Sequence, residues 1–493
     1  MKKAVVLPIV AAVSGVLLGC GGSSGGSSGP SKTQFNLEFR KADIQDFAVN
    51  NNCLIHDRSY NELVEGDNVI VESEVMFVSP ITTALNNGLY IQLSKADGSL
   101  VNDSLAYTSN GKASFFLEDI PDAGYLNVVE LFGPYKYVTS FSKEYLEDNR
   151  SVLRNMMLDV KQPIANLQCM TGSSLAMSPV SVKYRNSEDI PGSDIGSPTY
   201  YYQSDLKEVG SNNLSIDASY DLQALRGDIT SVANYRGSDN SSLRQYGFAD
   251  WGTEAEMVYT GEVAQVFQDN GIYQDLEVGV SYKNITKQLA QISLADGESS
   301  YYYPLNKNSN ESWAITAKGA PVTNWSNTLN MPIVDEAYSI DISSNESKLF
   351  SLSHLSDGAA TFANTDVKSL EVNMGAYINT AMANDGYQRI SIVPRNSSPI
   401  KQHTIYSELK DVVVVPKIEF IDAMSMETAL VEQSYVFKNK SDDLDIRFFM
   451  DSFTTQSVFG ADNESHGLLL GESERRALEA DVAKIDYMIL SNQ

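Results

Sequence analysis

The sequence has few of the side chains that build metal centres, redox sites and histidine-dependent active sites. It contains three cysteines and four histidines in 493 residues. No Cys-x-x-Cys or combined Cys/His spacing of a zinc site occurs, and the histidines show none of the short spacings that mark a metal or catalytic motif. The four are His56, His354, His403 and His466. We therefore predict no metal, no cofactor and no enzymatic activity.

Basic residues are also scarce. The chain has 36 Lys and Arg against 63 Asp and Glu, which gives a formal net charge of −27. Binding to nucleic acid depends on clustered Lys and Arg that neutralise phosphates, and adsorption to anionic lipid depends on a basic face. The sequence therefore predicts no nucleic-acid partner, and any attachment to a membrane needs another means.

The main long apolar run lies at the amino terminus. Lys2 and Lys3 precede an apolar stretch over residues 4–18. A membrane-spanning helix needs roughly 20 apolar residues, and this stretch is shorter and is interrupted by Pro8. Its positive start and its length are typical of a secretory signal peptide, which we assign to residues 1–19.

The signal segment ends in Leu17-Leu18-Gly19-Cys20. This pattern resembles the lipobox of bacterial lipoproteins. The resemblance implies cleavage before Cys20 and attachment of palmitate-like acyl chains to its thiol and its new amino group, and several such chains give stable anchoring. Gly21, in place of an aspartate, implies transport to the outer membrane of a Gram-negative cell. An ordinary secreted protein cleaved near this point is the alternative.

Residues 20–33 would then be the lipidated cysteine and a Gly/Ser-rich tether, a composition typical of flexible coil. Two cysteines remain, Cys53 and Cys169. In an oxidising compartment an even pair favours one disulfide between them. Two separate buried thiols are the alternative.

From residue 34 onward the sequence predicts an all-β protein. Residues 68–77 and 89–93 have the apolar and alternating patterns of strands, and turn dipeptides such as Asn110-Gly111 separate them. The stretches 108–117 and 120–129 resemble the last strands of carboxypeptidase-regulatory-like domains, which are transthyretin-like modules, and the match covers about residues 66–132. The resemblance implies an Ig-like β-sandwich without catalytic residues, which we assign to residues 34–162.

The rest of the chain divides into two predicted regions. Residues 163–410 show short alternating runs between turn residues, as expected for tandem sandwiches or for a β-propeller. Residues 411–493 predict a C-terminal β+α segment, with strands at 412–415, 435–437 and 446–450. Helices are expected at 142–158 and from Ser473 onward. The second has an apolar face formed by Leu478, Val482, Ile485 and Ile489.

Aromatic residues provide the only candidate binding residues. The 26 tyrosines include the runs 200–202 and 301–303. Exposed aromatic rings beside polar groups suit the flat faces of sugars, although tyrosine is also simply favoured in strands. The candidates for ligand binding are Tyr201, Trp251, Tyr302, Trp313 and Trp325.

These observations lead to one functional prediction and two alternatives. We expect a non-enzymatic outer-membrane lipoprotein that acts as a structural or binding component of the cell envelope or cell surface, in adhesion, in an appendage or in its sheath. Its partner would be an envelope protein or glycan. A carbohydrate-binding surface lipoprotein that stacks Tyr and Trp on sugars is the first alternative, and a polysaccharide or peptide hydrolase is the second.

Overall fold

We examined the fold in a computed structural model of the chain. It describes residues 32–48, 55–65, 68–80, 88–102, 106–161, 177–183, 200–203, 206–209, 219–225, 229–235, 243–250, 256–259, 264–268, 271–283, 285–294, 298–302, 310–333, 339–358, 361–365, 369–373, 378–394, 400–418, 429–450 and 466–492.

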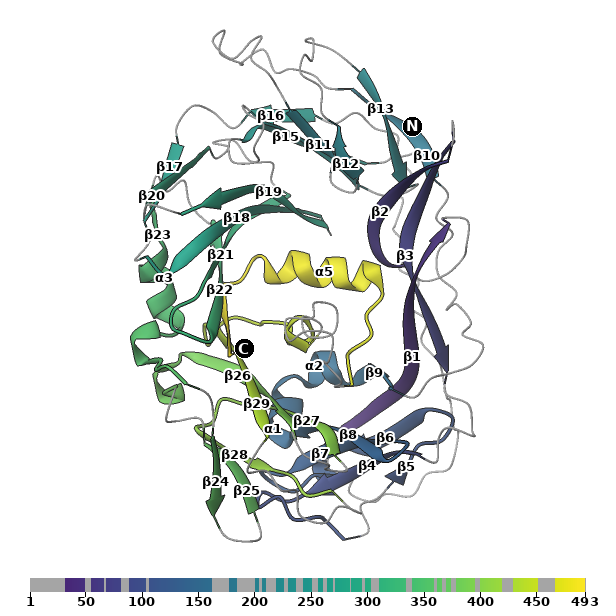
Figure 1. Cartoon of the computed structure of the whole chain (residues 1–493), viewed down its shortest axis with the longest axis vertical. Helices are drawn as coiled ribbons and strands as arrows, with labels where there is room; N and C mark the ends of the chain where they lie inside the picture. The colour runs from purple at the N-terminus through teal and green to yellow at the C-terminus, as the bar shows by residue number, and fades with distance from the viewer. Residues whose placement is uncertain are drawn as a thin grey trace, which may run out of the picture.

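The described chain is mostly β-sheet with a few short helices, which confirms the predicted all-β class. In Figure 1 the sheets lie around the outside of the view, and the helices α5 (Glu472–Val482), α1 (Lys143–Asp148) and α2 (Arg150–Leu153) lie in the middle. None of the helices in the described ranges is long and apolar enough to cross a membrane.

A twelve-stranded sheet dominates the molecule. All printed pairs of neighbouring strands in it are antiparallel, apart from the parallel pair formed by β27 and β8. In spatial order the strands are β19 (Ile285–Ser293), β18 (Tyr273–Tyr282), β21 (Glu311–Gly319), β22 (Trp325–Ile333), β30 (Tyr487–Asn492), β29 (Leu430–Lys438), β26 (Asp385–Val393), β27 (Ile400–Glu408), β8 (Tyr135–Ser142), β7 (Tyr125–Phe132), β4 (Leu89–Ser94) and β5 (Ala106–Tyr107).

Both faces of this sheet are covered, as β29 illustrates. Side chains of successive strand residues point to opposite faces. Tyr435 and Phe437 belong to a core with α3 (Ile342–Leu349), whereas Val436 between them belongs to a core with α1 and α5. Two-sided burial explains why β26 and β29 have long apolar or uncharged runs in place of a strict alternation of apolar and charged residues.

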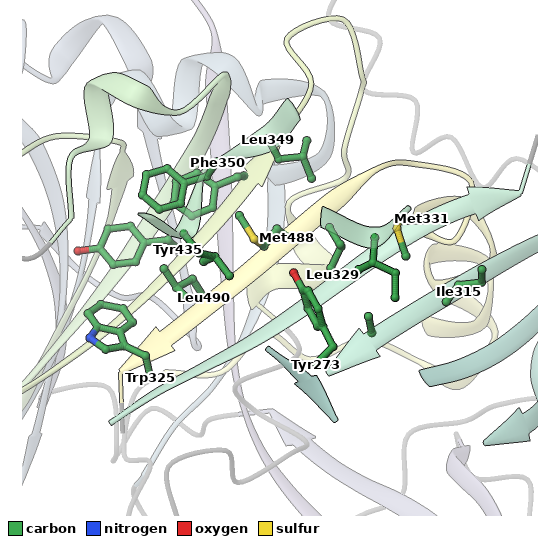
Figure 2. Close-up of a cluster of buried hydrophobic side chains, with 14 of the residues drawn as sticks. Tyr273, Ile315, Trp325, Leu329, Met331, Leu349, Phe350, Tyr435, Met488 and Leu490 are labelled. Carbon is green, nitrogen blue, oxygen red and sulfur yellow. The ribbon is translucent and has the colours of Figure 1, made fainter. Parts of the chain in front are cut away.

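The core on the α3 side is rich in aromatic rings (Figure 2). Phe350, which follows α3, stacks on Phe437 with ring centroids 4.8 Å apart, and Phe437 is 6.0 Å from Tyr435. Met488 and Leu490 of β30 are fully buried in the same core. Burying side chains of this size contributes about 1.5–3 kcal/mol each, so this core ties the final strand to the body.

A second sheet packs against the end of the first to form a sandwich. Its strands are β2 (Ile55–Glu65), β3 (Asn68–Pro80), β1 (Gln34–Ala48) and β6 (Lys112–Phe116), with β9 (Asn155–Asp159) parallel to β1. The shared core includes Phe35, Leu37 and Phe39 of β1 and Leu126, Val128 and Phe141 of the large sheet. Two sheets that share one core confirm the predicted sandwich-like packing of this region.

Four smaller sheets complete the described fold. They are β10 (Met177–Lys183) with β13 (Ser219–Leu225); β12 (Leu206–Val209), β11 (Tyr200–Gln203), β14 (Ile229–Tyr235), β15 (Leu243–Asp250) and β16 (Glu256–Tyr259); β20 (Glu298–Tyr302), β17 (Ala264–Gln268) and β23 (Ser339–Asp341); and β24 (Thr361–Thr365), β25 (Ser369–Asn373) and β28 (Val412–Val415). Short 3₁₀ turns lie at η2 (Leu117–Asp119), η3 (Leu352–His354) and η4 (Thr380–Met382).

The large sheet draws strands from all three predicted domains. Strands β4, β5, β7 and β8 come from 34–162, strands β18, β19, β21, β22, β26 and β27 from 163–410, and strands β29 and β30 from 411–493. The predicted boundaries therefore do not separate independent sheets. Local sequence patterns report that a segment is a strand, but they do not report which strand it pairs with.

The helix predicted over 142–158 is shorter in the structure. The Ser142 hydroxyl accepts a hydrogen bond from the Tyr145 N–H and caps α1, as expected of a helix start. The helical segment ends with α2, and residues 155–159 form β9 instead. Met156 and Leu158 are buried and alternate with exposed or half-buried neighbours. This alternation is the pattern of a strand, and β9 pairs with β1.

Two further predictions near the carboxyl end were wrong. The segment 447–450 is helical, not a strand. Helix α5 begins after Gly471, not at Ser473, and it ends at Val482, so Ile489 belongs to β30 and not to the helical face. Leu478 and Val482 are buried in the core as predicted. The strands expected at 412–415 and 435–437 are present as β28 and part of β29.

Candidate functional site

The strongest constellation of chemically active side chains joins a hydroxyl, an imidazole and a carboxylate. Thr139 Oγ1 lies 2.9 Å from His466 Nδ1, and His466 Nε2 lies 3.1 Å from Glu130 Oε2. When Nε2–H donates to the carboxylate, Nδ1 is left to accept the Thr139 O–H, so one tautomer satisfies both bonds. The order of groups is that of a nucleophile, a general base and an orienting acid.

Three elements bring these residues together. Glu130 is on β7, Thr139 is on the neighbouring β8, and His466 starts the segment 466–470 that precedes α5. This segment runs beside β9, with Asp159 N–H donating to Gly467 O and Leu469 N–H donating to Met157 O, each at 2.8 Å. The imidazole therefore lies on a segment that backbone hydrogen bonds tie to β9.

Burial decides what this arrangement can do. Glu130 and Thr139 are fully buried, and His466 is 1% exposed. The Glu130 carboxylate also accepts the Lys161 N–H at 2.8 Å, and Thr139 Oγ1 also accepts the His466 N–H at 3.4 Å. A nucleophile must contact its substrate, and here no face of the hydroxyl is open to solvent. The geometry is that of a structural clip between β7, β8 and the segment 466–470.

A second polar row lies on the opposite face of the same strands. Ser140 donates to Asn127 Oδ1 at 2.6 Å, Asn127 donates to Ser94 Oγ at 2.7 Å, and His403 Nε2 lies 2.8 Å from Ser140 Oγ. Because the single Ser140 hydrogen is used toward Asn127, Nε2 of His403 is the donor in that contact. The row crosses four neighbouring strands, β4, β7, β8 and β27.

His403 is neutral in this row. Burial lowers the pKa of its imidazole to about 3, because the charged form loses its hydration. Within the described part of the chain its Nδ1 has no hydrogen-bond partner. Adjacent positions of β8, Thr139 and Ser140, thus hold a buried histidine on each face of the sheet.

A third polar cluster holds α3 against the sheet. The Tyr273 hydroxyl donates to Glu346 Oε2 at 2.9 Å and accepts from Asn327 Nδ2 at 2.8 Å. All three residues are buried. Hydrogen bonds satisfy these polar groups away from water, and the cluster offers no surface to a ligand.

Two of the predicted aromatic site residues, Trp313 and Trp325, are buried in the core. Trp313 on β21 and Trp325 on β22 are 1% and 2% exposed. Trp313 packs edge-on against Tyr246, with centroids 5.0 Å apart, and Trp325 Nε1 donates to Gly358 O at 3.0 Å. Neither ring face is open for stacking on a sugar, so these two predictions do not hold in the folded protein. Core packing on strands explains both rings.

The other predicted site residues lie in separate sheets or outside the described residues. Tyr201 lies on β11 and Tyr302 on β20, in two different sheets. Trp251 lies outside the described residues, as do the predicted lipid-bearing Cys20 and the predicted disulfide pair Cys53 and Cys169.

Sequence reasoning missed the two histidine clusters. Thr139 and His466 are 327 positions apart, and Ser140 and His403 are 263 positions apart. The only available signal was that histidine is rare in this chain. Across the described residues no group of three or more His, Cys, Asp or Glu side chains is arranged to hold a metal ion.

Comparison with known proteins does not assign the chain to a family. No protein-family model matches the chain, and no curated protein gives a significant match.

Proposed function

We propose that this protein is a lipid-anchored component of the outer membrane that acts as a scaffold or binding element and not as an enzyme. The observation that carries the proposal is the sequence Leu17-Leu18-Gly19-Cys20 after a signal-like segment, followed by a Gly/Ser-rich stretch. The first strand, β1, begins at Gln34. A folded body would thus follow closely on an acylated cysteine.

The arrangement of buried polar groups supports the non-enzymatic part of the proposal. The Glu130–His466–Thr139 clip has the groups of a catalytic triad, but it lies inside the packing between β7, β8 and residues 466–470. The sheet is covered on both faces by apolar cores. These features suit a rigid body that holds its shape at the membrane.

The test is acylation of Cys20. Cells expressing the wild-type chain and the Cys20→Ala variant are grown with an alkyne-bearing fatty acid, and the purified chains are examined for label. We expect label on the wild type only, together with recovery in the outer-membrane fraction. Absence of label on the wild-type chain would overturn the proposal.

Protease treatment of intact cells then separates two kinds of partner. Cleavage of the body on intact cells indicates a surface component that meets adhesion, sheath or glycan partners. Full protection indicates a scaffold within the periplasm. A mass measurement without reductant on the same sample tests the proposed Cys53–Cys169 disulfide.

A further inference from the structure

The hairpin of β7 and β8 ends in two exposed aromatic rings. Phe132, the last residue of β7, pairs with Tyr135, the first residue of β8. These side chains are 38% and 45% exposed, and Gly133 and Pro134 between them are exposed as well. Most other positions of the two strands are buried. The rings therefore protrude from the body at a point where packing does not require them.

Lysines flank this aromatic tip. Lys401 Nζ lies 6.0 Å from the centroid of the Tyr135 ring, within reach of a cation–π contact. Lys136 follows Tyr135 and pairs with Ile400 of the adjacent β27. The chain as a whole has 63 acidic and 36 basic residues, so two lysines beside two exposed rings make the tip a local exception to its acidic character.

Aromatic rings with lysines suit the headgroup region of a bilayer. The Tyr135 ring has apolar faces and a polar hydroxyl edge, and rings of this kind gather at this level of a membrane. Phe132 adds apolar area, and lysines near a membrane are attracted to anionic headgroups. A small-molecule or sugar site is usually a concavity that surrounds its ligand, whereas this tip is a two-residue turn between two exposed rings. A hairpin tip favours a lipid surface over a soluble ligand.

The tip can reach the membrane that would hold Cys20. Lys32, where the described body begins, lies twelve residues after Cys20, and an extended chain of that length spans at most about 40 Å. Thr33 is hydrogen-bonded to Glu118 and Leu117, which precede β7 by a short turn. The eight residues of β7 then span about 25 Å to the tip.

We propose that the tip formed by Phe132 to Tyr135 enters the headgroup region of a bilayer containing anionic lipid and orients the body on the membrane. The proposal rests on the lipid-anchored function, since the acyl chains would bring the tip to the bilayer. The contact itself needs no acyl chain. It can therefore be measured on a chain that lacks them.

The experiment uses the exported full chain carrying Cys20→Ala, mixed with vesicles of phosphatidylcholine with or without phosphatidylglycerol and sedimented. We expect binding to the vesicles that contain phosphatidylglycerol. The double variant Phe132→Ser/Tyr135→Ser should weaken this binding by about tenfold, equivalent to about 1.4 kcal/mol, and Lys401→Gln should weaken it on anionic vesicles.

The chain offers a matched control for the tip. Phe116 is 37% exposed and has Lys32 Nζ 5.2 Å from its ring centroid, at the end of the sandwich near the tether. Phe116→Ser should leave vesicle binding unchanged. The thermal unfolding of each variant is compared with that of the parent, and because the replaced side chains are exposed we expect little change.

Three results would overturn the proposal: no binding of the unacylated chain to either vesicle, equal loss in Phe116→Ser and the tip variant, or tip-dependent capture of a glycan or protein without vesicle binding. None of these concerns acylation. A failure of fatty-acid labelling at Cys20 together with tip-dependent vesicle binding would instead remove the lipoprotein proposal and keep the bilayer contact.

Discussion

At the scale of single residues, two buried histidines beside one strand, His403 and His466, bear on the stability of the molecule. His403 and His466 contact Ser140 and Thr139, which are neighbours on β8 and face opposite sides of the sheet. Both contacts lie inside the packing, where losing a hydrogen bond to a buried group costs more than the bond itself gains. Both residues therefore have measurable effects on stability.

The lowered pKa of the buried His403 imidazole predicts that the protein loses stability in acid. Its folded pKa is about 3, below the ordinary value of 6.5, so below pH 6.5 the unfolded chain binds a proton that the folded chain does not. The stability it contributes is complete above about pH 6.5 and is lost as the pH falls toward 3, by about 1.4 kcal/mol for each pH unit. Across this range the free energy of unfolding, measured with urea, should depend less on pH in His403→Gln than in the parent.

The control for that series is His354→Gln, which changes an exposed histidine. It should keep the pH dependence of the parent. An equal pH dependence in the parent and in His403→Gln would contradict the prediction, because it would place the acid sensitivity in other groups.

Replacing His466 should lower the stability of the whole protein and also loosen the segment around it. His466→Ala removes the partner of a buried carboxylate and should lower the free energy of unfolding by about 1–3 kcal/mol. His466 lies in the segment 466–470, which is hydrogen-bonded to β9. The Leu469 N–H, which donates to Met157 O, should therefore exchange its hydrogen faster. Thr139→Val provides the comparison, since it removes the hydroxyl but keeps the side-chain shape. Unchanged exchange at Leu469 in His466→Ala would argue against a clip.

At the scale of elements, β30 joins two halves of the large sheet. It lies between β22 and β29 and pairs antiparallel with both. On one side lie the strands β19, β18, β21 and β22. On the other side lie β29, β26 and β27, followed by β8, β7, β4 and β5. Figure 2 shows Met488 and Leu490 on this strand between side chains contributed by both halves.

This position predicts a coupled loss of structure. Leu490→Ala removes a fully buried side chain and should cost about 2–5 kcal/mol. Hydrogen exchange should accelerate in β22 and in β29 together, although about a hundred residues separate them in the sequence. Val412→Ala, which changes a strand residue that is 43% exposed, should have little effect. Acceleration confined to one half would show that β30 does not couple them.

At the scale of the whole molecule, the sequence predicted the class of the fold but not the order in which its strands pair. Local alternation and turn dipeptides identified strands such as 89–93 and 412–415 because those signals are contained within a few residues. Strand β8 pairs with β27, more than 250 residues further along the chain, and β22 pairs with β30, more than 150 residues further along. No local pattern records such pairings.

The same limit applies to the candidate site. Trp313 and Trp325 attracted interest as aromatic residues, but whether a strand residue faces a core or solvent depends on what covers the sheet. The polar contacts of His403 and His466 depend on which strands meet. The exposed tip at Phe132 and Tyr135 also required the structure, since on a fully covered strand the same residues would be core.

The place of β30 has a consequence for the order of events during synthesis. A chain is made from its amino end, so β30 emerges after every other strand of the large sheet. Until residues 487–492 have emerged, β22 and β29 each present an unpaired edge, and open edges invite pairing with other chains. The large sheet therefore stays open to pairing with other chains until the last of its strands has been made.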